Sequence, residues 1–195
     1  MNLTVVKGLQ SEIFVPVTPP PVWAPVTKPL NEMVIALATA AGVHRKEDKR
    51  FNLAGDFTWR EIYDSTPSSD LMVSHGGYDN SDVNKDINCM FPIDRLHELA
   101  KEGFIKGVAP VHIGFMGGGG NIEKFTHETG PAIAKRLKDE GVDAVAPLVP
   151  MGANAGAPHN VEQQTAIVKA TLEQLEEITT PGTVVPLPFE YQAKV

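Results

Sequence analysis

Short apolar runs alternate with amphipathic segments along most of this chain, and this alternation constrains its fold more than any other feature. The segment 33–38 is a continuous apolar run, which is typical of a buried strand, and three further segments are predicted strands: 71–73, 107–113 and 142–148. Three longer segments carry apolar residues at helical spacing: 92–101, 121–140 and 160–177. The alternation predicts an α/β fold with a three-layer, mostly parallel sheet and helices on both faces, of the doubly wound or flavodoxin-like kind. We also expect a short last strand over 183–187.

Proline and glycine set the expected limits of the helices. Pro92 suits the first position of a helix, and Gly103 and Gly141 follow two of the helical segments as stop signals. The Gly130-Pro131 pair predicts a break inside the segment 121–140, because proline removes a backbone hydrogen bond there.

The first thirty residues contain six prolines, a density that opposes helix and favours an extended arm. The arm also carries apolar side chains, above all Phe14 and Trp23. We therefore expect residues 1–30 to lie on the body of the protein or on a second subunit of a homo-oligomer, and residues 31–195 to form a single α/β domain.

Charge and composition argue against several classes of partner. The formal net charge is −7 and no long basic run is present, which disfavours nucleic acid and anionic membrane surfaces. No apolar stretch approaches the ~20 residues that span a bilayer, and the N-terminus does not resemble a signal peptide. Cys89 is the only cysteine, so no internal disulfide can form, and we expect a cytoplasmic protein.

The segment 74–88 is the most unusual stretch, because it follows a predicted strand and is rich in polar side chains. His75 can act as an acid or base near neutral pH. Tyr78 can donate a hydrogen bond to a substrate oxygen, and Asp79 can orient a histidine or bind a metal. The alternative is a solvated loop whose Asp and Asn side chains bond to the nearby backbone.

Two further loops follow predicted strands. His112 lies at the end of the run 107–113, and a glycine loop follows it, in which three glycines can cradle an anionic group: Gly117, Gly118 and Gly119. The loop after residue 148 has small residues that allow close approach of a ligand, and three of its residues are expected to bind substrate: Met151, Asn154 and His159. A flexible turn is the alternative for the glycine loop, and a structural or surface role is the alternative for each histidine.

The carboxyl ends of parallel strands meet at one edge of a sheet. We therefore expect His75, Asp79 and His112 to share a pocket there, where they suit a divalent metal such as zinc or iron. Without a metal, the same groups can move protons, because a carboxylate near a histidine raises its pKa.

A set of short segments, in this order and spacing, resembles a known family. The segments are Ala41-Gly42-Val43-His44, Trp59-Arg60-Glu61-Ile62, Ser74-His75, Tyr78-Asp79, Asp86, Asn88, Phe91-Pro92, Arg95-Leu96, Gly103-Phe104-Ile105, Val108-Ala109-Pro110, His112, Phe115-Met116-Gly117 and Gly141-Val142-Asp143-Ala144-Val145. The set is similar to short members of the glycine/sarcosine/betaine reductase selenoprotein B family, which includes the selenoprotein subunit of D-proline reductase.

The resemblance implies a redox residue after the last of these segments. In the reductases, a selenocysteine or cysteine follows a Gly-Val-Asp-Ala-Val-like strand and attacks a C–N bond that a carbonyl cofactor on a partner subunit activates. Here the segment 147–159 has no cysteine, and the redox position falls at Met151, Gly152 or His159. Gln164-Thr165 resembles the residues that follow the redox motif in relatives.

Three functions are consistent with these features. The first is an enzyme that binds a small carboxylate- or amine-bearing substrate and performs acid–base or metal-assisted chemistry, as a lyase or hydrolase does. The second is a component of a glycine- or D-proline-reductase-type complex whose redox group lies on a partner subunit. The third is a non-catalytic binding subunit.

Overall fold

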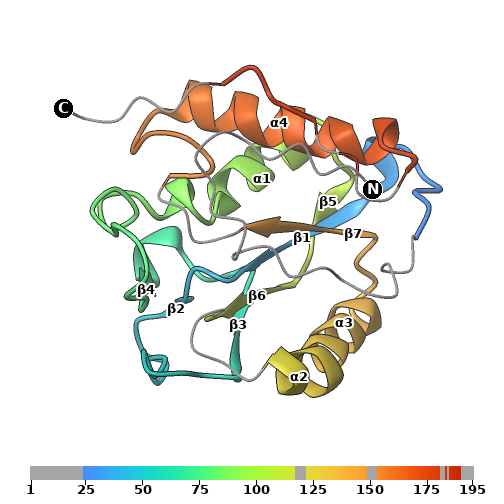
Figure 1. Cartoon of the computed structure of the whole chain (residues 1–195). Coiled ribbons are helices and arrows are strands. Elements are labelled where there is room, and N and C mark those ends of the chain that lie inside the picture. Colours follow the sequence, from blue (N-terminus) through green and yellow to red (C-terminus); the bar gives the residue numbers. More distant parts are fainter. Residues whose placement is uncertain (1–23, 117–121, 149–152, 181–182, 184, 190–195) are drawn as a thin grey trace.

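A central sheet with helices packed against it forms the body of the protein in the computed structural model (Figure 1). The structure describes residues 24–116, 122–148, 153–180, 183 and 185–189. Five strands make up this sheet: β1 (Val34–Thr39), β3 (Trp59–Tyr63), β5 (Gly107–Val108), β6 (Val111–Phe115) and β7 (Ala144–Leu148). The fold is therefore mixed α/β, as the alternating pattern predicts.

Strand β1 is the centre of the sheet. It pairs in parallel with β5, β6 and β7, whereas β3 pairs antiparallel with β6. Among the described strands β7 has only β1 as a neighbour, and such an edge position tolerates Pro147. The sheet is thus mostly parallel.

The predicted strand 107–113 is divided into β5 and β6 by Ala109 and Pro110. Val34 pairs with Gly107 and Ala38 pairs with Ile113, so the register slips between the two pieces. The slip leaves the buried N–H of Leu37 opposite the break, and the His112 ring accepts its hydrogen bond at 2.9 Å through Nδ1. His112 therefore lies near the beginning of β6 and does not end a strand, contrary to the sequence prediction.

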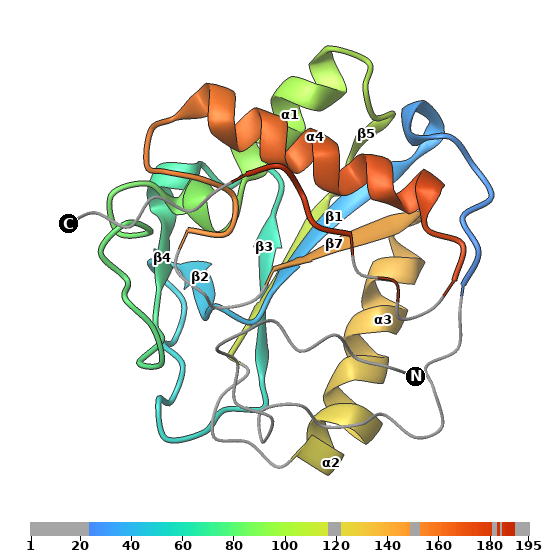
Figure 2. The ribbon, with the colours of Figure 1, turned by 45° about the horizontal axis from the view of Figure 1, so that its top comes forward.

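Helices cover the two sides of β1 (Figure 2). On one side, α1 (Ile93–Lys101) and α4 (Val161–Glu177) pack with Ile35 and Leu37 through an extensive apolar core. On the other side, α3 (Gly130–Asp139) packs with Ala36 and Ala38. Alternate residues of β1 thus pack into two separate clusters, which explains why the strand is apolar from Val34 to Ala38.

The helical segment 121–140 does not break at proline, contrary to the prediction. The turn η5 (Phe125–Thr129) is a π-helical turn between α2 (Ile122–Lys124) and α3. The N–H of Gly130 reaches back to the carbonyl of Phe125, and this wider turn carries the chain past Pro131 without ending the helix.

A second, two-stranded sheet consists of β2 (Val43–Arg45) and β4 (Leu71–Val73), which run antiparallel. Three 3-10 turns complete the described elements: η2 (Leu30–Glu32), η3 (Ser68–Asp70) and η4 (Ile87–Cys89). Strand β4 follows the prediction, but it lies outside the main sheet. The described residues between 183 and 189 form no strand, so that prediction is wrong for them.

Most of the predicted proline-rich arm lies outside the described residues. Its last part, 24–29, is exposed, and Lys28 forms an ion pair with Asp143 at 2.6 Å. The arm, the single-domain division and the flavodoxin-like layering stay predictions. No helix within the described part of the chain has the length and apolar character needed to cross a membrane.

Candidate functional site

A cavity of about 540 Å³ opens between the β2–β4 pair, the segment 83–88 and the amino ends of α1 and α4. Polar and apolar side chains line it together, among them Lys46, Leu71, Val83, Asp86, Arg95 and His159. Its volume is within the range of small-molecule sites. The cavity joins the polar loop that the sequence singles out to the loop in which the redox position is expected.

Asp86 ties these two loops together. Its Oδ1 accepts hydrogen bonds from the N–H and side-chain amide of Asn88, both at 3.0 Å. Its Oδ2 accepts from the N–H of His159 at 2.8 Å and from Nε2 of Gln164 at 2.7 Å. Partial burial alone would raise the pKa of Asp86, but these four hydrogen bonds outweigh it and lower the pKa.

Gln164 carries the connection into the helices. Its side chain is fully buried, and its Oε1 accepts from Nη1 of Arg95 at 2.9 Å. Nη2 of Arg95 donates to Glu98, and the N–H of Ala155 donates to the carbonyl of Cys89 at 2.8 Å. The loop 153–160 is therefore fixed against the segment 86–89 and the first turn of α1.

His159 has an unusual backbone. Its φ of 59° lies in the left-handed region, where residues other than glycine are strained. The side chain is exposed and lines the cavity, whereas its N–H is held by Asp86. The structure thus places one of the three possible redox positions at the mouth of the cavity. Asn154 is half-buried in the same loop, while Met151 and Gly117–Gly119 lie outside the described residues.

The loop that holds His75, Tyr78 and Asp79 is largely bonded to itself. Nδ1 of His75 accepts from the N–H of Gly77, and the carboxylate of Asp79 accepts from the N–H of Ser81. The centroids of the His75 and Tyr78 rings lie 5.0 Å apart. Burial lowers the pKa of His75. These contacts match the alternative interpretation of a self-bonded polar loop.

Tyr78 is held in a defined position. Its hydroxyl donates to the carbonyl of Ala41 at 3.1 Å, just beyond β1. Burial of the half-buried ring raises the pKa of Tyr78 to about 12. The phenol therefore remains a neutral hydrogen-bond donor throughout the physiological range.

His112 belongs to a different environment. Its ring is fully buried and stands edge-on to Phe91, with 5.8 Å between ring centroids. Its Nε2 lies 3.6 Å from Oδ1 of Asp64, and the same oxygen lies 2.6 Å from Nε2 of His97. Burial lowers the pKa of His112, although Asp64 opposes this effect. The histidine thus contacts Asp64, Leu37 and Phe91.

The expected cluster of His75, Asp79 and His112 is not formed as a metal site. No group of three or more His, Cys, Asp or Glu side chains within the described residues is arranged to hold a metal ion. Strand β4 pairs with β2, outside the parallel sheet, so the loop after β4 does not begin at the edge where the parallel strands end. His112 also lies near the start of β6. The polar loop contacts Ala41 through Tyr78, and Ala41 bridges to Met116, which lies roughly 13 Å beyond His112 at the rise of a strand. The catalytic roles of His75, Tyr78, Asp79 and His112 stay predictions.

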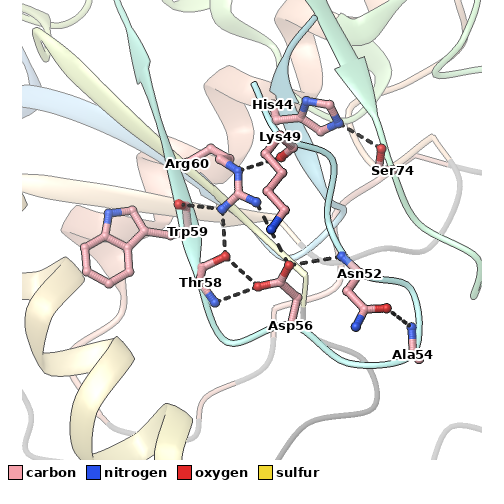
Figure 3. Close-up of polar contacts among 9 residues, drawn as sticks. All are labelled: His44, Lys49, Asn52, Ala54, Asp56, Thr58, Trp59, Arg60 and Ser74. Atoms are coloured by element: carbon pink, nitrogen blue, oxygen red, sulfur yellow. Dashed lines mark hydrogen bonds and ion pairs between the residues drawn. The ribbon is translucent and has the colours of Figure 1, made fainter. Parts of the chain in front are cut away.

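A third polar cluster lies where β2 leads into β3 (Figure 3). Nε2 of His44 lies 2.8 Å from the hydroxyl of Ser74, and its Nδ1 lies 2.7 Å from the carbonyl of Arg45. Arg60 donates to the carbonyl of Lys49 and to the hydroxyl of Thr58. These contacts fold the connection back on itself.

The sequence did not predict that Asp86, Arg95 and Gln164 form one hydrogen-bonded network, since nothing in their spacing shows that they meet.

The chain belongs to the glycine/sarcosine/betaine reductase selenoprotein B family, whose model matches residues 6–148. The resemblance seen in the sequence is thus confirmed. The D-proline reductase subunit gamma of Acetoanaerobium sticklandii is 56% identical over 100% of this chain and 99% of that relative. The sarcosine reductase complex component B subunit beta of Peptoclostridium acidaminophilum is 30% identical over 72% of this chain and 34% of its own length.

A further relative is the glycine reductase complex component B subunit gamma of Carboxydothermus hydrogenoformans, which is 34% identical over 62% of this chain and 29% of its own length. The chain thus spans about a third of the sarcosine and glycine reductase subunits that it matches. No solved structure matches it.

The D-proline reductase relative differs from this chain in internal length. The alignment extends over 240 positions and includes the whole chain of 195 residues, so the relative carries internal residues that have no counterpart here. The family match ends at residue 148, where β7 ends and where the sequence predicts the redox position to follow.

Proposed function

We propose that this chain is a component of a D-proline- or glycine-reductase-type complex in which a partner subunit supplies the redox group. The observation that carries the proposal is the 56% identity to a D-proline reductase subunit gamma along the entire chain. The other relatives are also subunits of reductase complexes, which supports assembly with partners.

The chain's own cysteine is poorly suited to the redox step. Cys89 is the only cysteine and is fully buried under the loop 153–160, whereas a reactive thiolate needs access and a lowered pKa. The loop after β7 offers no thiol. Reductive cleavage of a C–N bond therefore requires a thiol or selenol from another chain.

Independent lyase or hydrolase chemistry has less support than the complex. The histidines expected to act as an acid–base pair occupy separate environments, and no relative described above carries such an activity in its name. Within the complex, we propose that the chain binds the small carboxylate- or amine-bearing substrate. A non-catalytic binding subunit is the second candidate, because the chain has a cavity but no redox residue in the loop after β7.

Reconstitution tests the proposal. The purified chain is added to the remaining D-proline reductase subunits of A. sticklandii after removal of their subunit gamma. We expect it to co-purify with them on size exclusion and to show no D-proline reduction with dithiol on its own. Authentic subunit gamma is the positive control for assembly and turnover.

Two results would contradict the proposal. Failure to associate under conditions in which authentic subunit gamma assembles would exclude a complex of this type. Turnover of D-proline by the isolated chain would show that it contains its own redox group, and a Cys89→Ser variant would then show whether the thiol is responsible.

A further inference from the structure

We propose that the loop 49–58 is a docking surface for an acidic segment of a partner protein, and that the side chain of Leu53 enters an apolar pocket on that partner. The inference rests on the proposed function in one respect, because the partner is then another subunit of the reductase complex. It goes beyond that function by naming the surface and the chemistry that the surface recognises.

The loop is held in shape by its own polar groups (Figure 3). The carboxylate of Asp56 accepts hydrogen bonds from the N–H of Asn52 at 3.0 Å and from the N–H of Thr58 at 2.8 Å. The side chain of Asn52 accepts from the N–H of Ala54, and its carbonyl accepts from the N–H of Gly55. Gly55 has a φ of 144°, a conformation that favours glycine. A loop that is ordered before binding loses little conformational entropy when a partner docks on it.

Both ends of the loop are fixed to the body of the protein. Phe51 is only 4% exposed, and the guanidinium of Arg60 lies 4.4 Å from the centre of its ring. Nε of Arg60 also donates to the carbonyl of Lys49 at 2.9 Å, which joins the beginning of the loop to β3. At the other end, the hydroxyl of Thr129 donates to the carbonyl of Phe57 at 2.8 Å. The tip of the loop therefore projects from a fixed base.

Leu53 at this tip is the most exposed large apolar side chain in the described part of the chain. Its exposed fraction is 59%, against 48% for Val161 and 45% for Tyr63. A single exposed leucine on a mobile surface would carry no meaning. Here an ordered loop holds the leucine beside a charged hollow, and an apolar centre with a polar rim is the usual arrangement of a protein interface.

The hollow beside Leu53 is lined mainly by cations. Its volume is about 510 Å³, and Lys49, Arg60 and Lys124 contribute three positive charges to its wall. The carboxylate of Asp56 is the single negative charge among its lining residues, and it already accepts hydrogen bonds from within the loop. An anionic side chain of a partner therefore fits this hollow better than a cationic one.

The charges that precede the loop have the same sign. Arg45 forms ion pairs with both Glu47 and Asp48, each at 2.7 Å. Lys49 and Arg50 are exposed and have no ion pair within the described part of the chain. The whole chain has a formal net charge of −7, so the positive charge is local to this surface. The combination favours an acidic protein segment over nucleic acid, which the chain as a whole repels.

Binding to the remaining D-proline reductase subunits of A. sticklandii tests the surface. The affinity of the full-length chain for these subunits is measured at low and at high salt. Lys49→Glu should weaken binding about ten-fold at low salt and less at high salt, because it reverses a charge that faces the acidic segment. Leu53→Ser should weaken binding about ten-fold at both salt concentrations, because it removes an apolar contact.

Lys138→Glu is the matched control for the charge reversal. Lys138 is exposed on α3 and also has no ion pair within the described part, so its replacement changes the net charge equally but should leave the affinity unchanged. Urea denaturation should give Leu53→Ser the stability of the wild type, since Leu53 is exposed. A weaker assembly of this variant then reports on binding and not on folding.

The inference is wrong if Lys49→Glu and Leu53→Ser both bind the subunits as tightly as Lys138→Glu does. It is also wrong if the wild-type chain binds a single-stranded oligonucleotide and Lys49→Glu abolishes that binding without any effect on assembly, because the surface then recognises nucleic acid. If the wild-type chain does not assemble where authentic subunit gamma does, the proposed function itself is wrong and the inference falls with it. The two failures are therefore distinguishable.

Discussion

The region around His112 and the region around Asp86 both place polar side chains inside the protein, but these side chains satisfy different needs. His112 accepts the N–H of Leu37 that the slip between β5 and β6 leaves unpaired. Asp86 holds together the loop before α4, the 3-10 turn η4 and α4, which come from distant parts of the chain. In the first region a side chain completes the hydrogen bonding of a strand, and in the second a side chain holds together the segments that line a cavity.

The difference shows why a polar residue near a strand end is an ambiguous signal. A buried N–H without a partner costs about 1–3 kcal/mol, so a nearby side chain can be retained for backbone repair alone. His112 lies within β6, where its Nδ1 accepts from the distant N–H of Leu37, whereas Nδ1 of His75 accepts from the N–H of the nearby Gly77. Only the register of β5 and β6 against β1 reveals that His112 completes the backbone hydrogen bonding.

The largest expected effect comes from removing the centre of the cavity region. Asp86→Ala leaves four donors without their acceptor, two of them on the buried side chains of Asn88 and Gln164. We expect a loss of about 3 kcal/mol in the free energy of unfolding, measured by urea denaturation. Such a loss would show that Asp86 organises this region.

Asp79→Ala is the control for this change. Asp79 is exposed, and among the described residues its carboxylate accepts one hydrogen bond, from the N–H of Ser81. We expect a loss of no more than about 0.5 kcal/mol. If the two variants are equally stable, the polar network around Asp86 does not distinguish the two loops.

The second effect tests backbone repair by His112. His112→Phe keeps an aromatic ring beside Phe91 but leaves the buried N–H of Leu37 without an acceptor. We expect a loss of about 2 kcal/mol in the free energy of unfolding. Slower hydrogen exchange at Leu37 in the wild type than in the variant would locate the effect.

A catalytic role would give a different pattern. His75→Phe should cost far less stability, because the Nδ1 of His75 accepts only from the neighbouring Gly77. If His112→Phe leaves stability unchanged, the ring is not needed to repair the strand, and a functional role for it gains support.

Much of the fold could be predicted from local sequence patterns. The run 33–38 and the segment 160–177 correspond to β1 and α4 because burial on both faces and helical spacing are visible locally. The break at Ala109 and Pro110 could not be predicted, since the register of β5 and β6 depends on pairing with β1.

The site was less predictable than the fold. The sequence indicates that the loops at 74–88 and 147–159 are candidate site loops, and residues of both line the cavity. It does not indicate that Gln164, inside an amphipathic helix, bonds to both Asp86 and Arg95. Such contacts depend on how α4 packs against α1, and this packing cannot be read from the spacing of residues within either helix.

A smaller effect is expected at Tyr78, which links the polar loop to the end of β1. Tyr78→Phe removes the hydrogen bond to the carbonyl of Ala41 and keeps the ring. We expect a loss of about 1 kcal/mol in the free energy of unfolding. In the wild type, absorbance titration should show one tyrosine that ionises only near pH 12 and is missing from the variant. A variant with the full wild-type tyrosine titration above pH 11 would contradict the assignment.

The smallest effect concerns pH and compares the buried histidines with the carboxylates. Burial lowers the pKa of His44, His75 and His112 below the unfolded value of 6.5. Between the folded pKa and 6.5 the unfolded chain binds more protons, so stability rises with pH in that window and is complete above it. The pKa of Asp86 is also lowered, and its contribution is lost only below the unfolded value of 3.8.

Urea denaturation at pH 8, 6 and 5 separates these contributions. We expect a loss of stability from pH 8 to 6, as the histidines of the unfolded chain take up protons, and a steeper loss per pH unit from pH 6 to 5, where those histidines are almost fully protonated. In His112→Phe the loss of stability from pH 6 to 5 should be smaller, because one histidine with a lowered pKa is gone. The ion pair of Asp64 with His97 is kept in this variant. His127→Gln, an exposed change in η5, should keep the wild-type slope. An unchanged slope in His112→Phe would mean that burial of this ring is not linked to protonation.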